Sequence, residues 1–305
     1  MLQIHNGCER NKRTTRFMEL VVIHNPAAGG GSWNAKRVER LLRAAGHDAQ
    51  ITSAKKKWRD LLREEPDAFV AAGGDGTVHD LLHALAGRPV PLAILPTGTA
   101  NNVAHAFGFT VEQDLAQRVA RWAENEKTLQ IPLVESGSET RFFLESVGFG
   151  AFARMVRNSD ENAKKSAAAV AILAIRKALV KKLLAADPVR VATRIDGTSL
   201  EGEYVLLECL NLPWYGPRLR LAAHESPATA TVTVCGVRAE AREQAAQWIA
   251  TGDGDASAWV LGRGASVELR SDESAHVDGA IWQDKDARVG PLRIRAGARA
   301  VRVWV

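Results

Sequence analysis

A strand–loop–helix pattern that occurs three times in the first third of the chain constrains the fold more than any other feature of this sequence. Short apolar segments at 18–25, 67–72 and 91–95 are each followed by a glycine-containing loop and then by apolar residues at helical spacing. Alternation of this kind is typical of a parallel sheet covered by helices. Ligands of such sheets bind beyond the carboxyl ends of the strands, so the three loops are predicted to share one binding edge.

The loop after the second segment reads Gly73, Gly74, Asp75, Gly76 and Thr77. Its glycines let backbone N–H groups approach a phosphate, and the helix behind the loop adds partial positive charge there. Asp75 is a candidate ligand of a Mg²⁺ ion that bridges phosphates, and Thr77 is a candidate helix cap or phosphate donor. The competing interpretation is that a strand-to-helix turn simply favours glycine.

The other two loops carry similar groups. One runs from Asn25 into a triple glycine that includes Gly30, where Ser32 could cap the next helix. The other contains Thr99 and Asn101, which are good helix caps and also good hydrogen-bond partners for a ribose or a phosphate. Three such loops at successive strand ends predict one nucleotide-binding edge.

Beyond about residue 130 the pattern changes to β-branched, often alternating segments separated by turn residues. Strands are predicted over 140–147, 189–195, 204–210, 229–234, 265–269 and 291–305, and helices over 161–186 and 239–251. We therefore predict an α/β nucleotide-binding domain with a parallel sheet over 18–130. A mainly antiparallel, β-rich domain is predicted over 131–305, and its last strands could return to the first domain.

Composition narrows the class of protein. The chain has 305 residues, of which 46% are hydrophobic and 25% charged, so it can bury a sizeable core. Its net charge of +5 fits anionic ligands or membrane surfaces, and no aromatic pattern indicates nucleic-acid binding. Cys8, Cys209 and Cys235 are too scattered for a disulfide framework or a zinc motif, which favours the cytoplasm. We expect neither a secretory signal in the polar leader 1–17 nor a membrane-spanning helix.

Three stretches together resemble the diacylglycerol kinase catalytic-domain family, which includes bacterial lipid kinases and sphingosine kinases. They read VVIHNPAAGGG, AAGGDGTVHDLL and LPTGTANNVA, in the family's order and spacing. A weaker resemblance continues at 147–150, 211–217 and 277–279. It implies a phosphofructokinase-like nucleotide domain, a β-rich lipid-substrate domain and ATP in the cleft between them. The implied reaction is transfer of the γ-phosphoryl group to a lipid hydroxyl, in phospholipid biosynthesis.

The resemblance also implies roles for individual residues. Asp278 matches the family's late aspartate, the general base on the acceptor hydroxyl, and Asp75 would act through Mg²⁺ and phosphate. The loop analysis and the resemblance together give this set of nucleotide-binding candidates: Asn25, Gly30, Gly73, Gly74, Asp75, Gly76, Thr77, Thr99 and Asn101. Diacylglycerol is the leading acceptor, while sphingoid bases, phosphatidylglycerol and isoprenoid alcohols stay open.

The sequence departs from the family pattern at four places. Asn102 stands where the family has an aspartate after PxGTxN, and Pro132 stands in place of a later carboxylate. Ala280 replaces the glutamate of the DGE motif. The family's aspartate after the YGxxL region, associated with a structural metal, has no counterpart in SPATATVTV. Fewer carboxylates imply a different metal arrangement, a different acceptor or weak activity.

Two further patterns have competing interpretations. The predicted helix at 161–186 is basic and amphipathic, so it either docks peripherally on an anionic membrane or packs on the core with a solvated charged face. His79 and His83 have the spacing of a zinc-binding pair, but no third ligand is evident, so a surface or packing role is predicted.

The oligomeric state is open, with a homodimer as the candidate.

Two rival functions stay open beside the lipid kinase. A non-catalytic nucleotide- or lipid-binding protein would explain the missing carboxylates, although Asp75, Thr77 and Asp278 are retained. NAD kinases also use a GGDGT loop, but they lack the PxGTxN loop at this spacing.

Overall fold

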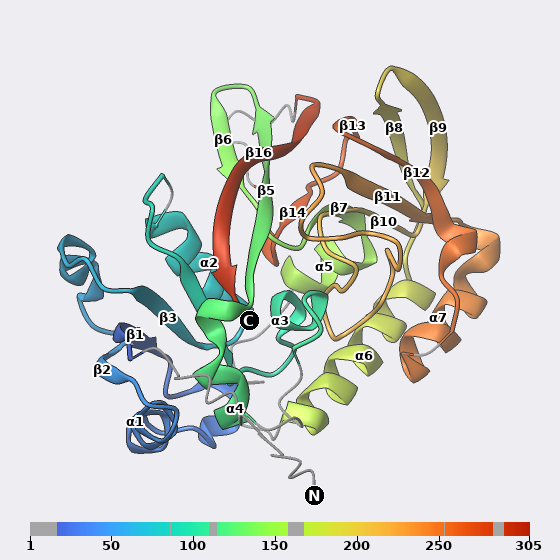
Figure 1. The fold of residues 1–305 in the computed structure, drawn as a ribbon. Helices are drawn as coiled ribbons and strands as arrows, with labels where there is room; N and C mark the ends of the chain where they lie inside the picture. Colours follow the sequence, from blue (N-terminus) through green and yellow to red (C-terminus); the bar gives the residue numbers. More distant parts are fainter. Residues whose placement is uncertain (1–16, 86, 110–114, 158–167, 253, 283–289) are drawn as a thin grey trace, which may run out of the picture.

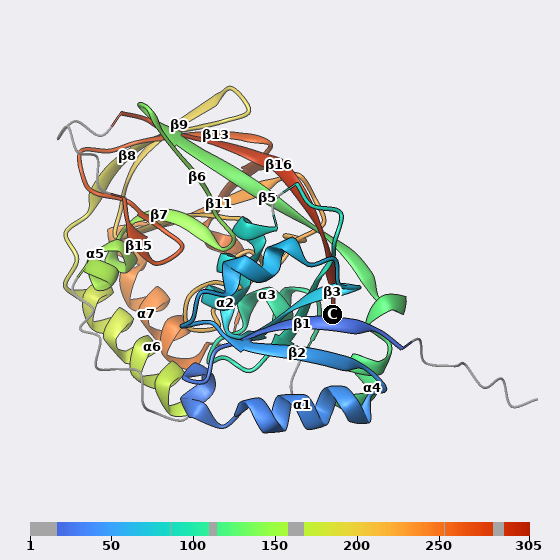
Figure 2. The same ribbon diagram turned by 90° about the vertical axis from the view of Figure 1, so that its left-hand side faces the viewer.

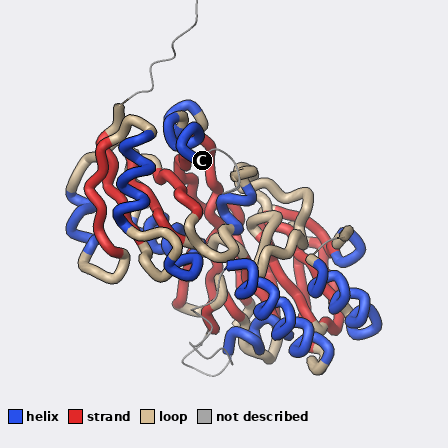
Figure 3. The backbone as a smooth tube through the Cα atoms, turned by 90° about the horizontal axis from the view of Figure 1, so that it is seen from below, coloured by secondary structure: helices blue, strands red, loops and turns tan. Residues whose placement is uncertain are grey.

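The computed structural model describes residues 17–85, 87–109, 115–157, 168–252, 254–282 and 290–305. An α/β region formed by the first strands lies beside a mainly antiparallel β region, as predicted from the sequence (Figure 1). Viewed from below, helices lie over the strands in both halves of the chain (Figure 3).

The described helices and strands follow one another through the whole chain. The strands are β1 (Glu19–His24), β2 (Asp48–Ser53), β3 (Ala68–Gly73), β4 (Leu92–Pro96), β5 (Glu126–Ser136), β6 (Glu139–Phe142), β7 (Ser146–Gly150), β8 (Val189–Ile195), β9 (Thr198–Tyr204), β10 (Leu206–Leu210), β11 (Val232–Val237), β12 (Val260–Gly264), β13 (Ser266–Arg270), β14 (His276–Val277), β15 (Ala280–Ile281) and β16 (Leu292–Trp304). The α-helices are α1 (Ala35–Ala44), α2 (Asp75–Ala84), α3 (Asn102–Ala106), α4 (Leu115–Ala120), α5 (Ala151–Arg157), α6 (Ala168–Leu184) and α7 (Arg242–Thr251). The short 3-10 helices are η1 (Ala28–Gly31), η2 (Trp58–Arg63), η3 (Trp122–Glu124), η5 (Ala239–Ala241) and η6 (Ser257–Trp259).

The first four strands form a parallel sheet in the order β2-β1-β3-β4. Alternate residues of each strand enter different cores, since Val21 packs with α2 while Leu20 and Val22 pack with α1. Figure 2 shows α1 and α2 on opposite sides of these strands. Both faces of the sheet are therefore covered, and its loops remain available at one edge.

Local signals explain most of these elements, but two predictions need correction. Asn34, not Ser32, caps α1, because the Asn34 Oδ1 atom accepts the Arg37 N–H at 2.9 Å. Gly46 follows the cap residue Ala45, and its φ of 86° suits the residue that ends a helix. The sequence analysis missed β2, a partly exposed edge strand whose residues DAQITS show little apolar alternation.

The last strand links the two halves of the molecule. β16 pairs with β4 in parallel at Val303 and Trp304, and with β5 and β13 in antiparallel register. The parallel strands therefore belong to the same sheet as β16, β13, β8 and β9, and this sheet has 10 strands among the described residues. A second, six-stranded sheet has the order β12-β11-β10-β7-β14-β15.

The strand predicted over 140–147 is wrong as a single element. β6 ends at Phe142 and β7 begins at Ser146, and the backbone between them leaves the strand pairing. The predicted strand 204–210 is likewise divided between the end of β9 and β10. The first of these interruptions positions the site. Backbone N–H groups that no longer take part in strand pairing there bind another segment of the chain.

The predicted basic helix forms α6 over its described part, and residues 161–167 lie outside the described residues. Leu179 and Leu183 are buried in a core that α6 shares with α5 and α7. Ile172 is also buried, while Val170 and Leu173 are exposed. The core-packing interpretation therefore holds for one face of α6. In the described part of the chain, no helix combines the length and apolar character needed to cross a bilayer.

Candidate functional site

An open cleft of about 1000 Å³ lies where the glycine loops face the second half of the chain. All three loops contribute to its wall, and Leu144, Glu145, Val277 and Asp278 contribute from the other side. Most of the predicted site residues line this cleft: Asn25, Gly30, Gly74, Asp75, Gly76, Thr77, Thr99 and Asp278. Gly73 and Asn101 are not among the lining residues, and their predicted contacts with a nucleotide stay predictions.

The three loops pack on one another through their backbones. A Cβ atom on Gly98 would lie 2.2 Å from the Gly74 Cα atom, and one on Gly29 would lie 2.4 Å from the Thr97 carbonyl oxygen. Such approaches are possible only without side chains at these positions. Close packing brings the backbone of all three loops to one wall of the cleft.

Asn101 holds the third loop in shape. Its Oδ1 atom accepts the Gly98 N–H at 2.9 Å, and its Nδ2 atom donates to the carbonyls of Pro96 and Gly98. The residue is buried and adopts a left-handed φ of 54°, so its side chain does not cap α3. Its amide is thus already used within the loop.

Asp75 connects the second and third loops. It begins α2, and its Oδ1 atom accepts the Val103 N–H of α3 at 3.0 Å. Burial raises the pKa of this carboxyl, while hydrogen bonds from the backbone of 101–103 oppose the rise. Thr77 follows in the first turn of α2 without capping it, because Gly74 occupies the cap position.

Asp278 lies in the two-residue turn between β14 and β15. Asp278 and Gly279 have φ values of 46° and 75°, as tight hairpin turns require. The Asp278 carboxylate accepts the N–H groups of Leu144, Glu145 and Ser146 at 2.6, 2.8 and 3.1 Å. Leu144 and Glu145 belong to the interruption between β6 and β7, and Ser146 begins β7, so the carboxylate is held by the backbone of another segment.

His79 and His83 also line the cleft. Their Nε2 atoms lie 3.0 Å apart, and His79 Nε2 lies 3.6 Å from Asp278 Oδ2. Burial lowers the pKa of His83, and the neighbouring His79 lowers it further. Because His79 belongs to the helix that begins at Asp75, this contact joins the two walls of the cleft.

Glu145 is a site residue that the sequence analysis missed. Its Oε2 atom accepts Asn102 Nδ2 at 2.9 Å and the Gly216 N–H at 3.2 Å. Burial, and then the charges of Asp75 and Asp278, raise the pKa of Glu145 well above its ordinary value. A charged residue inside the apolar stretch FFLESVGFG was the available signal.

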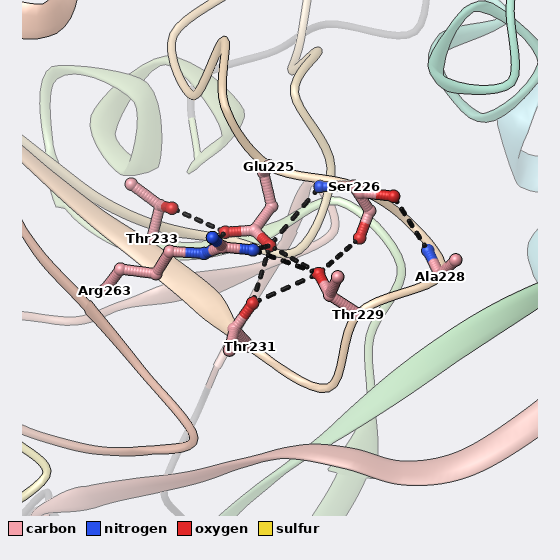
Figure 4. A network of polar contacts seen from close by, with 7 residues as sticks. All are labelled: Glu225, Ser226, Ala228, Thr229, Thr231, Thr233 and Arg263. Atoms are coloured by element: carbon pink, nitrogen blue, oxygen red, sulfur yellow. Dashed lines mark hydrogen bonds and ion pairs between the residues drawn. The ribbon is translucent and has the colours of Figure 1, made fainter.

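The region where the family has a structural metal is organised differently. Glu225, immediately before SPATATVTV, is buried, and Arg263 contacts both of its oxygens at 2.9 and 3.1 Å. Hydroxyl groups of Thr229, Thr231 and Thr233 donate to the same carboxylate (Figure 4). A guanidinium therefore supplies the positive charge here, so these residues do not call for a metal.

Metal-ligating groups are sparse elsewhere too. Among the residues that the structure describes, no three or more histidine, cysteine or acidic side chains form a group arranged to hold a metal. A Mg²⁺ ion in the cleft would thus need phosphate oxygens besides one or two carboxylates, which is its usual mode with nucleotides. Asp75 and Glu145, as oxygen ligands lining the cleft, fit that mode.

Comparison with known proteins identifies the class of domain. Residues 19–133 match the family model described as diacylglycerol kinase catalytic domain. A curated relative from Pseudomonas fluorescens named "Probable lipid kinase YegS-like" is 31% identical over 158 residues, covering 48% of this chain and 49% of its own. The "Diacylglycerol kinase" of Mycobacterium tuberculosis is 44% identical over 50 residues, which cover 16% of each chain. The chain thus spans about half the length of the first relative and less of the second.

Solved structures extend the likeness in fold to nearly the whole chain. Two structures from Bacillus anthracis str. Sterne, both named for diacylglycerol kinase, superpose with TM-scores of 0.69 and 0.64 at 21% and 20% identity. They cover 96% and 93% of this chain, and 97% and 96% of their own. The match of residues 19–133 to the diacylglycerol kinase catalytic-domain model confirms the resemblance drawn from the three loops.

Proposed function

We propose that this protein is an ATP-dependent lipid kinase that transfers the γ-phosphoryl group of ATP to the hydroxyl of diacylglycerol. One observation carries the proposal. The three glycine loops and Asp278 line the same cleft, and the His79–Asp278 contact of 3.6 Å spans it. Phosphoryl transfer needs mainly positioning and charge neutralisation, and the cleft offers groups for both.

The loop wall is the nucleotide end of this proposed site. Backbone groups of Gly30, Gly74 and Gly76 can approach phosphate oxygens, and the partial positive charge at the start of α2 favours phosphates there. Asp75 and Glu145 would hold Mg²⁺ together with phosphate oxygens. When bound, Mg²⁺ neutralises charge that develops on the transferred group.

The opposite wall is the acceptor end. The lipid hydroxyl oxygen attacks the γ-phosphorus, its proton passes to a carboxylate oxygen of Asp278, and ADP leaves. Three backbone N–H groups hold the Asp278 carboxylate in place while leaving its Oδ2 atom near His79. A general base fixed in this way needs little reorganisation during the transfer.

The lipid is expected to reach the cleft from a membrane surface beside α6. Ala171 of α6 lines the cleft, and its neighbours Val170 and Leu173 are large exposed apolar residues. Lys177 and Lys181 are exposed further along the helix, whereas Arg176 donates to the carbonyls of Pro217, Arg218 and Thr251. This face suits peripheral contact of a cytoplasmic protein with anionic lipid.

The test is phosphorylation of lipids in mixed micelles by the full chain with ATP and Mg²⁺. Diacylglycerol is compared with sphingoid bases, phosphatidylglycerol and isoprenoid alcohols, and Asp75→Ala is assayed in parallel. We expect a phosphorylated diacylglycerol product that disappears in Asp75→Ala. Phosphorylation of a different lipid would overturn the acceptor. Nucleotide binding without phosphorylation of any lipid would overturn the kinase and favour a binding protein.

A further inference from the structure

We propose that Glu145 supplies the carboxylate that the chain lacks at position 102, and that the divalent cation bound with the nucleotide is held through Glu145 and Asp75. The inference deepens the proposed function and rests on it for the nucleotide. It adds Glu145, a residue that the family resemblance does not place in the site, to Asp75, which the resemblance does place there. Four observations support it.

The first observation is that positions 102 and 145 are direct neighbours. Asn102, at the start of α3, donates through Nδ2 to Glu145 Oε2 and to the Gly216 carbonyl, both at 2.9 Å. The carboxylate oxygen of Glu145 and the carbonyl oxygen of Gly216 can only accept. They therefore fix the orientation of the Asn102 amide, whose nitrogen is its only donor. Position 102 therefore orients the carboxylate rather than carrying it.

The second observation is that Glu145 has an oxygen to offer. Asn102 and Gly216 both contact Oε2, and within the described part of the chain no donor reaches Oε1. The side chain is only partly buried and lines the cleft beside the glycine loops. A carboxylate oxygen on a residue that lines this cleft is a ligand of the type that Mg²⁺ prefers.

The third observation is electrostatic. Asp75, Glu145 and Asp278 line the same cleft. Three carboxylates crowded at one cleft repel one another, and a bound cation relieves this repulsion. Asn102 Oδ1, buried and without a described partner, is a further oxygen on the amide that contacts Glu145.

The fourth observation is that the two positions constrain each other. An aspartate at 102 would place a second carboxylate against Glu145 across a contact that now measures 2.9 Å. Like charges at that distance prevent both groups from ionising together. A charged carboxylate at 145 thus requires a neutral hydrogen-bond donor at 102. Compared with the family pattern, the negative charge is on residue 145 instead of residue 102.

The experiment measures Mn²⁺ binding by electron paramagnetic resonance, in the presence of a non-hydrolysable ATP analogue. Four variants are compared with the natural chain: Glu145→Gln, Asn102→Asp, the double variant, and Glu201→Gln as an exposed control on β9. We expect Glu145→Gln to weaken Mn²⁺ binding by about 10–100-fold, and Glu201→Gln to leave it unchanged. The double variant, with its carboxylate at 102, is expected to regain most of the affinity.

Thermal melting of each variant confirms that it is folded, and analogue binding without metal checks the nucleotide site separately. If Asn102→Asp does not fold, the double variant is compared with Glu145→Gln alone. Natural Mn²⁺ affinity in Glu145→Gln, or no recovery in the folded double variant, overturns the inference. Glu145-dependent Mn²⁺ binding in a chain that phosphorylates no lipid would overturn the proposed function while supporting this inference.

Discussion

Two glutamates of this molecule have opposite surroundings. One is contacted by a basic side chain and hydroxyl groups, and the other has acidic neighbours. Glu225 has no exposed side-chain surface and is contacted by Arg263 and by hydroxyls of Thr229, Thr231 and Thr233 (Figure 4). Among the residues that the structure describes, Glu145 accepts hydrogen bonds from neutral donors of Asn102 and Gly216 only, and the nearby charges are those of Asp75 and Asp278.

The difference lies in where the compensating charge comes from. A buried carboxylate is stable when a guanidinium and several hydroxyls satisfy it, and Glu225 has these within the fold. Within the described part of the chain, Glu145 lacks such a partner, and it lines the cleft. An uncompensated carboxylate in a cleft costs folding free energy and prepares a site for a cation. The predictions below separate the two cases.

The largest effect is expected from Asp278→Asn in the cleft. An asparagine tolerates the left-handed turn but cannot accept the hydroxyl proton, so turnover should fall by about 10²–10⁴-fold. Steady-state phosphorylation of diacylglycerol measures the loss, and affinity for ATP should stay near the natural value. Asp272→Asn, at an exposed neighbour, is the matched control. Equal turnover in Asp278→Asn and the natural chain would remove the assigned base.

The next effect is expected from Arg263→Ala in the Glu225 network. Removing the guanidinium leaves a buried carboxylate without its charge partner, so the free energy of unfolding should fall by about 3–5 kcal/mol. Urea unfolding measures this change. Arg190→Ala, which breaks the exposed pair with Glu201, should change stability little. A loss of nucleotide affinity in folded Arg263→Ala would contradict a purely structural role.

The lysine charges on α6 are expected to affect neither the free energy of unfolding nor the turnover. Replacing Lys177 and Lys181 together by glutamine should weaken binding to anionic vesicles by about 1 kcal/mol per lysine. Vesicle sedimentation with phosphatidylserine measures the change. Exposed Lys36 and Lys127, replaced together, serve as the control of equal charge. If both double variants lose the same affinity, α6 is not the docking face.

The smallest effect, and one of opposite sign to Arg263→Ala, is expected from Glu145→Gln without metal. The pKa of Glu145 in the folded protein is raised above its ordinary value of 4.5. The stability that the protonated side chain contributes is therefore fully present below pH 4.5 and is lost as pH rises through the folded-state pKa. Glutamine keeps an acceptor for Asn102 without that loss. The variant should thus be more stable at pH 8 by on the order of 1 kcal/mol. Thermal unfolding at pH 4 and pH 8 measures this, and destabilisation at pH 8 would contradict it.

The sequence by itself determined the strands and loops of the proposed nucleotide edge. Apolar strands followed by GGDGT and PTGT loops are local patterns, and parallel strands place their carboxyl ends at one edge whatever the distant sequence does. The β-rich second half was also predictable, because alternation of apolar and polar residues is local. Partial exceptions were β2 and the interruption after Phe142, where the local alternation does not reveal an edge or a break.

Only the tertiary structure decided which side chains meet across the cleft. Asp278 finds its donors in Leu144 to Ser146, more than 130 residues earlier, and Asn102 meets Glu145 from another element. Likewise, β16 returns to pair with β4 and joins the parallel strands to β5 and β13 in one sheet. Contacts of this kind depend on register and packing between distant segments. The local pattern around Glu145 or His79 therefore carries no sign of its partner.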